Sequence, residues 1–468
     1  MVGRYCLNRR DVFVLYGVQR FLPDFSLEMG SVRFIFFGNT AKFHYCLCRR
    51  SGGGMEIEMN EKTLYIKNAR IVRGDGRVPE AGGVIVSYAD GKGTISEIGK
   101  VKAPENCSIS DAKGAYLFPA FVDIGCRFFD SKHPSRDSIA SAGAAAVGGG
   151  FLTLLCEPDE AGMALKKGLT VESRCRIIPA VYPRTPAEIA QCGRNVYSDN
   201  GHWISDPGLM REIMLACAAS DSLFISTCID QRIAGDGVIN PGKTARILGL
   251  PIIPESAETT AAARDILLAA ETGCRLHIRA VSCENTLALI RYAKQRGFKI
   301  TCGTSALYYS MSDSDMFYYG GSAKVMPPLR NTKDVKAIRE ALADGTVDCI
   351  TSLHTPLTRT ENCSDLRKCY FGASGFDTAF SAFITYMVKS GFGNLDLLAR
   401  LFSLNPAKIL GLDSSLKAGA RADFALADPD AEIVVSSNTM KSKSVNTPYL
   451  GLTLNGCIKA VFSDGVRI

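Results

Sequence analysis

Hydrophobic positions from about residue 62 onward follow two periods, one typical of strands and one typical of helices. Short alternating or β-branched runs predict strands near both ends of this region, at 63–69, 82–88, 422–427, 432–435 and 457–462. Between them, strand-like runs alternate with helical patterns. The strand-like runs are 151–156, 176–181, 223–228, 275–281, 299–302 and 347–352, and the clearest helical patterns are 256–271, 286–295 and 332–343.

This order predicts an α/β fold. About eight strand–helix units over roughly 290 residues are typical of a (β/α)8 TIM barrel. We place the barrel at 118–412. Because both flanks are strand-rich, we expect residues 62–117 and 413–468 to form one small β-sandwich built jointly by the two chain ends.

Composition is that of an ordinary globular protein: 468 residues, 46% hydrophobic and 22% charged. No run of eighteen apolar residues occurs, so we expect no membrane span and no membrane partner. The 17 cysteines are scattered and form no C-x-x-C pair. With no secretory signal in view, these cysteines favour reduced thiols and a cytoplasmic location.

The formal charge of +7 is concentrated at the N-terminal end. Residues 1–54 hold eight Lys/Arg and three Asp/Glu, a net +5, which leaves +2 for the remainder. Such a weak balance does not predict a nucleic-acid partner.

Residues 1–54 differ from the remainder of the chain in being basic and aromatic, with a period that fits neither strand nor helix clearly. They end in the run RRSGGG, directly before Met55. We interpret the segment as a mis-annotated extension, with translation starting at Met55 or Met59. A flexible tail or a small docking segment is the alternative.

Several short motifs resemble those of class I dihydroorotases. They are LFPAFVD at 117–123, GGGFLT at 148–153, SDNG at 198–201, LGLP at 248–251 followed by Pro254 and Glu258, VMPPLR at 325–330, NPA at 405–407 with LG at 410–411, and KSKS at 441–444 followed by NTPY at 446–449. Each motif is weak alone, but their common order over roughly 400 residues is specific. The chain is therefore identified as resembling that family of the amidohydrolase superfamily from about residue 62.

The resemblance implies a zinc-dependent hydrolase of pyrimidine biosynthesis. In such enzymes zinc polarises the amide carbonyl and turns bound water into hydroxide, while an Asp after the last strand serves as general base and acid. The ligands are an H-x-H pair on the first strand, a bridging carboxylate, two further histidines and that Asp.

The family's ligand positions are mostly replaced in this chain. The degenerate positions are Gly125 and Arg127 for the H-x-H pair, Asp199 with Asn200 for the carboxylate motif, Thr227 and Ala280 for the two later histidines, and Leu353 for the Asp. Positions that contact substrate in the family are replaced as well, by Phe129, Asp159, Met326 and Leu357.

These replacements predict a protein without metal-dependent hydrolase activity and with no zinc or other cofactor. Arg127 would put a permanently charged guanidinium where a dication should bind, and Leu353 cannot transfer a proton. A catalytic zinc site needs about three protein ligands. Of the six ligand positions, only the carboxylate at Asp199 remains.

Two other groups of residues have alternative interpretations. His202, His277 and His354 are candidates for a rebuilt metal site or for hydrogen-bonded structural histidines. Cys126 and Cys283 are candidates for nucleophiles or soft ligands, or for small core residues.

Arg127 and Arg279 would bind an anion in the old pocket or form an internal salt bridge, with Asp199 or Asp159 as the carboxylate. The glycines at 148–150 lack the spacing of a phosphate loop, and we expect them to pack a helix against the barrel.

Three functions fit this sequence. The first, which we favour, is a catalytically inactive, homo-oligomeric subunit that supports aspartate transcarbamoylase. The others are a small-molecule binder and a divergent cyclic amidohydrolase, each using a remodelled barrel pocket.

Overall fold

The computed structural model describes residues 26–29, 32–37, 44–49, 63–127, 133, 135–156, 173–193, 195–199 and 201–468. The chain divides into two compact units, Met1–Lys62 and Thr63–Ile468. In the first unit, β1 (Ser26–Met29), β2 (Val32–Phe37) and β3 (His44–Arg49) form an antiparallel sheet in that order. The described residues of this segment are therefore strands, and the proposed start of translation stays a prediction.

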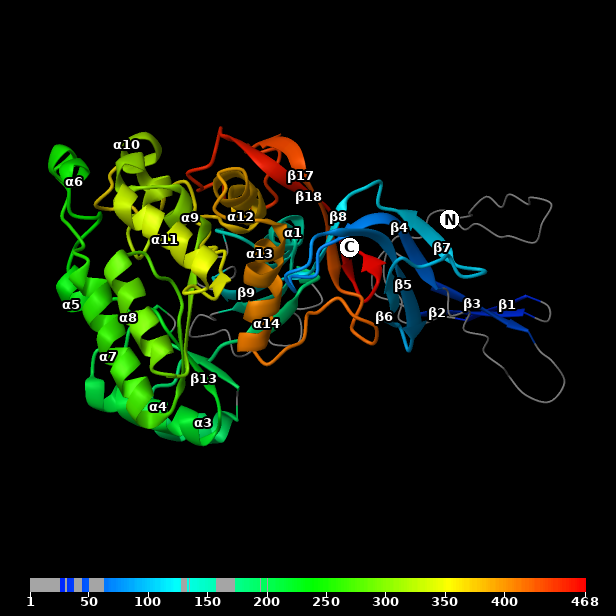
Figure 1. Cartoon of the computed structure of the whole chain (residues 1–468), viewed down its shortest axis with the longest axis horizontal. Coiled ribbons are helices and arrows are strands. Elements are labelled where there is room, and N and C mark those ends of the chain that lie inside the picture. The colour runs from blue at the N-terminus through cyan, green and yellow to red at the C-terminus, as the bar shows by residue number, and fades with distance from the viewer. Residues whose placement is uncertain are drawn as a thin grey trace. The chain divides into compact units, whose positions relative to one another are not determined.

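The second unit contains a barrel of eight parallel strands (Figure 1). They are β9 (Phe121–Cys126), β10 (Phe151–Cys156), β11 (Arg176–Pro179), β12 (Val196–Ser198), β13 (Leu223–Ser226), β14 (Arg275–Ile278), β15 (Ile300–Thr304) and β16 (Cys349–Ile350). Two arcs, β11-β10-β9 and β12-β13-β14-β15-β16, meet at a parallel bridge between Val181 and Tyr197. On the other side, the Arg127 amide donates to the His354 carbonyl oxygen at 2.8 Å.

Helices follow the strands around the outside of the barrel. The longer ones are α1 (Ile139–Gly148), α3 (Pro186–Cys192), α4 (Pro207–Ala219), α7 (Ser256–Thr272), α8 (Glu284–Gln295), α11 (Thr332–Asp344) and α12 (Phe376–Phe383). The shorter ones are α5 (Gln231–Ala234), α6 (Lys243–Leu248), α9 (Ala306–Ser310), α10 (Met316–Tyr319), α13 (Leu395–Ala399) and α14 (Asn405–Ile409). The short 3-10 helices η2 (Asp313–Asp315) and η3 (Gly320–Ala323) flank α10, and π-helical turns extend α12 over Ile384–Val388 and α13 over Arg400–Leu404.

Local sequence explains why these helices begin and end where they do. The side chain of Asn331 accepts hydrogen bonds from the amides of Lys333 and Asp334, which caps the start of α11. The helix ends at Gly345, whose φ of +82° is costly for any residue with a Cβ. None of the helices in the part of the chain described here is long and apolar enough to cross a membrane.

The core lies between strands and helices. Every residue of β9, β10 and β13 is buried, as expected for parallel strands covered on both faces. Phe121, Phe151 and Phe402 pack within it in edge-to-face and tilted pairs, with ring centroids 5.2–6.0 Å apart.

The two flanks of the barrel form a single mixed sheet. Its strands are β4 (Leu64–Ile71), β5 (Glu80–Ala89), β6 (Lys92–Gly99), β7 (Ser108–Asp111), β8 (Tyr116–Pro119), β17 (Phe424–Val434), β18 (Thr453–Ser463) and β19 (Val466–Arg467). Their order is β19-β18-β17-β8-β4-β5-β6, with β7 on β4, so β8 from one flank pairs with β17 from the other.

This sheet curls around its own core. A bridge between Thr94 of β6 and Arg421, just ahead of β17, joins the far edge back to the middle of the sheet, and residues such as Val84 and Phe424 are enclosed. The α/β fold, a barrel with a small β-structure made by both flanks, is confirmed. The two strands expected at 422–427 and 432–435 are one strand, β17, which is interrupted by a register shift between Asp428 and Glu432.

Candidate functional site

The positions expected for metal ligands lie at the carboxyl ends of the barrel strands, where barrel enzymes place their chemistry. Gly125 is near the end of β9, and the side chain of Arg279 crosses directly over it. A Cβ built on Gly125 would lie 2.9 Å from Cδ and 3.1 Å from Cγ of Arg279. No side chain of any kind fits at position 125 unless Arg279 moves. The Arg279 side chain therefore occupies the space that a histidine at position 125 would need.

Arg127 makes a similarly close approach to Gly201. A Cβ on Gly201 would clash with the Arg127 guanidinium, which therefore lies against the backbone of the SDNG motif. The Arg127 side chain is half-buried, and Arg279 is 8% exposed. Two permanently charged cations thus occupy the neighbourhood in which the family resemblance places a dication.

Asp199, the one retained ligand position, is fully buried and bound by protein donors. It accepts from the Thr227 amide at 2.7 Å, the Thr227 hydroxyl at 2.6 Å and the Gly201 amide at 3.1 Å. Thr227 itself stands at another ligand position. The residues at two of the expected ligand positions are therefore hydrogen-bonded to each other, and both oxygens of the Asp199 carboxylate accept hydrogen bonds.

A second buried carboxylate, that of Asp265, shares the Ser226 hydroxyl with Asp199. The Ser226 hydroxyl is 2.7 Å from Asp265 and 3.3 Å from Asp199. Asp265 also accepts from Trp203 Nε1 at 3.0 Å and from Arg264, whose guanidinium lies 3.8 Å from the Trp203 ring centre. Burial raises the pKa of Asp265. The contacts hold Ser226 and, through it, the end of β13.

The segment after β16 is fastened to β9 by Asp123. Asp123 accepts from the Thr351 hydroxyl at 2.5 Å, the Ser352 amide at 3.2 Å, the Ser352 hydroxyl and the Gly125 amide at 3.1 Å. Leu353 follows in the left-handed region, with φ of +47°. Ala280 is fully buried. Neither Leu353 nor Ala280 offers a ligand or a titratable group.

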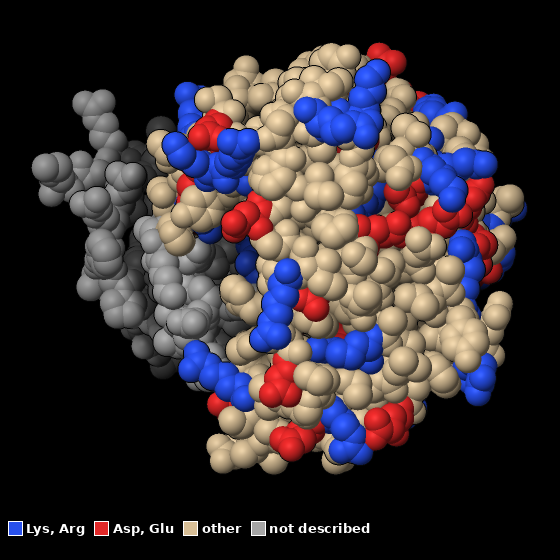
Figure 2. Space-filling model, turned by 90° about the vertical axis from the view of Figure 1, so that its left-hand side faces the viewer, with Lys and Arg blue, Asp and Glu red and all other residues tan. Residues whose placement is uncertain are grey.

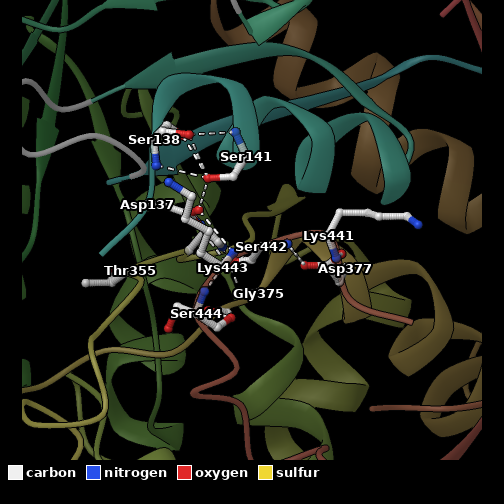
Figure 3. A network of polar contacts seen from close by, with 12 residues as sticks. Asp137, Ser138, Ser141, Thr355, Gly375, Asp377, Lys441, Ser442, Lys443 and Ser444 are labelled. Carbon is white, nitrogen blue, oxygen red and sulfur yellow. Dashed lines mark hydrogen bonds and ion pairs between the residues drawn. The ribbon is translucent and has the colours of Figure 1, made fainter. Parts of the chain in front are cut away.

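Asp137 links the start of α1 to the segment 441–444 near the C-terminal end (Figure 3). It accepts from Ser141, from the Ser442 hydroxyl at 2.6 Å and from the Lys443 amide at 3.1 Å. His354 Nε2 is 3.6 Å from Asp137, and its ring stacks on Phe376 with centroids 4.3 Å apart. Burial raises the pKa of Asp137, but the contacts with His354 and the serines outweigh it and leave the pKa below its usual value.

The three candidate histidines occupy different environments. His277 is buried, with Nδ1 2.9 Å from the Thr301 hydroxyl, and burial lowers its pKa to about 3. His354 lies against Asp137, whereas His202 is exposed. Among the residues that the structure describes, no three His, Cys, Asp or Glu side chains are grouped to hold a metal ion.

The candidate cysteines are buried as well. Cys126 Sγ is 3.6 Å from Cys156 Sγ, and Cys283 Sγ is 3.1 Å from the Thr286 hydroxyl and 3.4 Å from Glu258. Burial raises the pKa of Cys283, which disfavours a thiolate nucleophile. The glycine run at 148–150 packs as expected: a Cβ on Gly149 would clash with the Phe376 carbonyl.

A further polar cluster was not expected from the sequence. Arg330 is buried, donates to Ser282 at 3.0 Å and to Asn240 at 3.1 Å, and lies 3.4 Å from Glu258. Glu258 and Arg330 both belong to the motifs that carried the resemblance, but nothing in their spacing showed that they pair. Met326, nearby in the chain, packs against an apolar group that includes Ile253.

Leu357 is held by its backbone. Its amide donates to Ser444 at 3.1 Å and to Asn446 at 3.2 Å, and its carbonyl accepts from Ser444 at 2.6 Å. Three other expected site positions, Phe129, Asp159 and Asn200, lie outside the described residues.

The donors present do not fit a zinc ion. At the described ligand positions, Gly125, Ala280 and Leu353 have no donor atom, Arg127 is cationic, and Thr227 donates its hydroxyl hydrogen to Asp199. One carboxylate that is already hydrogen-bonded falls short of the three or so ligands that a catalytic zinc requires.

Comparisons with known proteins agree with the sequence motifs. A model of the family described as dihydro-orotase-like matches residues 183–286. The dihydroorotase of Thermoanaerobacter sp. is 33% identical over 419 residues, which cover 86% of this chain and 96% of that protein. The dihydroorotase of Geobacter metallireducens is 33% identical over 412 residues, covering 84% and 96% respectively.

Solved structures agree on the fold. The dihydropyrimidinase of Brevibacillus agri superimposes with a TM-score of 0.75 at 18% identity, covering 87% of this chain and 95% of that one. The L-hydantoinase of Arthrobacter aurescens gives 0.75 at 22% identity, covering 87% and 96%. On the strength of its curated relatives, the chain belongs to the dihydroorotase-like family of the amidohydrolase superfamily.

Proposed function

We propose that this chain is a non-catalytic dihydroorotase-like protein of pyrimidine biosynthesis that acts in the cytoplasm as a structural subunit for aspartate transcarbamoylase. It has no metal-dependent hydrolase activity and carries no zinc. The chain works as a homo-oligomer, most simply a dimer, and its barrel serves as a scaffold.

The observation that carries this proposal is that two arginine side chains occupy the space around the end of β9. Arg279 fills the volume above Gly125, and Arg127 lies against Gly201. A metal site lost by a single substitution would leave its remaining ligands facing an unfilled volume. Here cationic side chains, which cannot serve as metal ligands, pack into that volume. The remaining carboxylate of Asp199 is hydrogen-bonded to Thr227.

The surrounding scaffold supports a structural role. The buried carboxylates of Asp123 and Asp137 and the guanidinium of Arg330 are hydrogen-bonded to segments far apart in the sequence. Such buried networks are costly when incomplete. These networks support a role in which the folded barrel is needed without the metal ligands.

Elemental analysis and an activity assay test the catalytic part. We expect no stoichiometric zinc and no interconversion of dihydroorotate and carbamoyl aspartate, with one of the dihydroorotases named above assayed in parallel as the positive control. Arg127→His or Leu353→Asp alone should not restore turnover, because Gly125, Thr227 and Ala280 still supply no ligand. About one or two zinc ions per chain, or turnover that a chelator removes, would overturn the proposal.

Co-expression with the organism's aspartate transcarbamoylase tests the partner. We expect the two proteins to elute together in size-exclusion chromatography at micromolar concentrations, and deletion of this gene to lower transcarbamoylase activity. Separate elution together with unchanged activity would refute the scaffold role.

A small-molecule binder is the second candidate, because two guanidinium groups, those of Arg127 and Arg279, are placed at the barrel mouth. Calorimetric titration with inorganic phosphate and with a dicarboxylate tests it. Binding that is lost in Arg127→Gln would favour this function over the scaffold. Absence of heat with both anions would count against it.

A further inference from the structure

A pair of cysteines lies in the segment that follows β16. Cys363 and Cys369 are separated by five residues, and both are free thiols. The Asp365 carbonyl oxygen accepts a hydrogen bond from the Cys369 amide at 3.0 Å and another from the Cys363 thiol at 3.4 Å. The side chains of the two cysteines are also hydrogen-bonded to each other. A single turn of backbone therefore holds two thiols in contact.

The packing around this turn fixes the position of both cysteines. A Cβ built on Gly321 would lie 2.5 Å from Cys369 Sγ and 3.1 Å from the Cys363 carbonyl oxygen, so the sulfur uses space that only a glycine leaves open. Lys324 is 2% exposed, and its ammonium donates to the carbonyl oxygens of Leu366 at 2.8 Å and Cys369 at 2.5 Å. Contacts from outside the turn therefore hold the two thiols in place.

Access from solvent distinguishes this pair from other thiols that lie close together in the described part of the chain. Cys363 is half-buried beside the exposed Ser364, whereas Cys369 is 4% exposed. Both members are buried in two other close pairs, Cys126 with Cys156 and Cys217 with Cys274. A reagent in solution therefore reaches Cys363 first, and Cys369 is in contact with it.

Ionisation also favours different roles for the two thiols. Burial raises the pKa of Cys369, the neighbouring Cys363 sulfur raises it further, and the Lys324 ammonium opposes both effects. Cys369 therefore stays protonated at neutral pH. Because oxidation by peroxide depends on thiolate character and on access to solvent, these properties favour Cys363 as the first thiol to react and Cys369 as the thiol that reacts with its product.

The charges around the segment do not favour an oxidant of one sign. The Arg367 guanidinium donates to the Gly249 carbonyl oxygen at 2.5 Å, which places the segment next to the end of α6. Figure 2 views the side of the molecule where α5, α6 and α10 lie, and there Lys and Arg are interspersed with Asp and Glu. A small, uncharged oxidant needs no cluster of like charges, and hydrogen peroxide is such a molecule.

We propose that Cys363 and Cys369 form a site of reversible oxidation by hydrogen peroxide. The Cys363 thiolate attacks one peroxide oxygen, the O–O bond breaks, and the departing hydroxide takes up a proton to leave as water. The Cys369 thiol then attacks the sulfur of the resulting sulfenic acid, the S–O bond breaks, and the Cys369 proton leaves with the hydroxide as a second water. Two thiols are thereby oxidised to one disulfide, and one peroxide is reduced to two waters. This site does not depend on the proposed function.

Peptide mapping of the full chain tests the site. The reduced protein is treated with hydrogen peroxide, alkylated, and digested with trypsin under denaturing conditions without reductant. Because trypsin cleaves after Arg367 and Lys368, the disulfide joins peptide 360–367 to peptide 369–389. We expect this linked pair to form about tenfold faster or more than any link within the two buried pairs, and to be lost on treatment with dithiothreitol. An absent link, or one that forms no faster than those of the buried pairs, would overturn the proposal.

Single substitutions test the order of the two reactions. In Cys369→Ser, the sulfenic acid on Cys363 has no thiol to meet, so dimedone should label it and excess peroxide should convert it to sulfinic acid. In Cys363→Ser, the buried Cys369 should stay reduced under the same treatment. Cys192→Ser is the matched control, because it removes an exposed cysteine at the end of α3 and should leave the rate of the linked pair unchanged. Labelling of Cys369 in Cys363→Ser as fast as that of Cys363 in Cys369→Ser would overturn the assigned order.

Discussion

The expected ligand positions at the barrel mouth offer few polar groups, whereas the buried carboxylates beside them make many hydrogen bonds. Gly125, Ala280 and Leu353 carry no ligand atom, and Thr227 is bound to Asp199. Directly below, Asp123 has four hydrogen-bond contacts with Thr351, Ser352 and Gly125, and Glu258 is paired with Arg330. The positions without a ligand atom therefore lie beside buried carboxylates that are densely hydrogen-bonded.

The difference follows from what each group does for stability. A metal ligand that loses its metal contributes little to the fold and can be replaced by a residue that packs. A buried charge that loses its partner is left desolvated and uncompensated, which costs several kcal/mol. Selection on folding alone would therefore retain the networks but not the ligands.

The largest effect is expected from Glu258→Gln. The side chains of Glu258 and Arg330 are 0% and 1% exposed, so the variant leaves a guanidinium buried without its counter-charge. We expect a loss of about 3–5 kcal/mol in the free energy of unfolding, measured in urea at neutral pH. Glu284→Gln is the control: it breaks a pair with Lys333 whose side chains are 43% and 78% exposed, and should cost less than about 1 kcal/mol. Equal losses of stability in both variants would contradict the expected difference between the buried and the exposed ion pair.

A large pH effect is expected from His277, which is fully buried on β14 beside Thr301. Burial lowers its folded-state pKa from 6.5 to about 3, so the unfolded chain binds a proton in this window and the folded chain does not. Stability should therefore fall by roughly 1 kcal/mol per pH unit on acidification below 6.5.

This pH dependence is measured by urea unfolding at several pH values. His277→Asn should reduce the slope between pH 6.5 and 4, since asparagine keeps a hydrogen-bonding group near Thr301 but does not titrate. Thr301→Val, which removes the hydrogen-bond partner of His277 but no titratable group, should lower stability at every pH and leave the slope unchanged. An unchanged slope in the first variant would show that His277 is accessible to protons in the folded chain.

Titration of Glu361 should have a smaller effect on stability, and at a more acidic pH. Burial raises its pKa, but the ion pair with Arg136 at 2.7 Å and hydrogen bonds from Thr358 outweigh it and lower the pKa to about 2. Its stabilisation is present above the ordinary pKa of 4.5 and is lost as the pH falls towards 2. We expect Glu361→Gln to cost roughly 2 kcal/mol at neutral pH and to flatten the acid limb of the stability curve.

The matched control for Glu361 is Glu340→Gln. Glu340 pairs with Lys336 at 3.5 Å on the surface, with side chains 53% and 69% exposed, and the variant should change the unfolding free energy by less than about 1 kcal/mol. An acid limb that is equally steep in Glu361→Gln and in the wild type would remove the role given to the Arg136 pair.

The smallest effect should come from a ligand position. Leu353 has φ of +47°, a conformation that asparagine tolerates better than leucine. Leu353→Asn should therefore change the unfolding free energy by less than about 1 kcal/mol, with relieved strain offsetting lost packing. Ile350→Asn, at a fully buried position of β16, should cost roughly 2 kcal/mol or more. A costly Leu353→Asn would mean that leucine was selected for packing.

The sequence alone predicted much of the barrel. Buried parallel strands need apolar residues on both faces, so runs such as 151–156 stand out, and β10 has those bounds. The helices at 256–271 and 332–343 were predicted from their period and observed within one residue. The run at 275–281 was too long, because its hydrophobic pattern continues after the hydrogen-bonded strand ends at Ile278.

The replaced ligand positions were also determined by sequence, because motif order places Gly125, Thr227 and Leu353 without coordinates. Only the tertiary structure decided what fills the site. Arg279 over Gly125 and Glu258 beside Arg330 join residues from different strands and helices. Such pairings depend on barrel closure and on the rotamers of long side chains, and neither leaves a local pattern in the sequence.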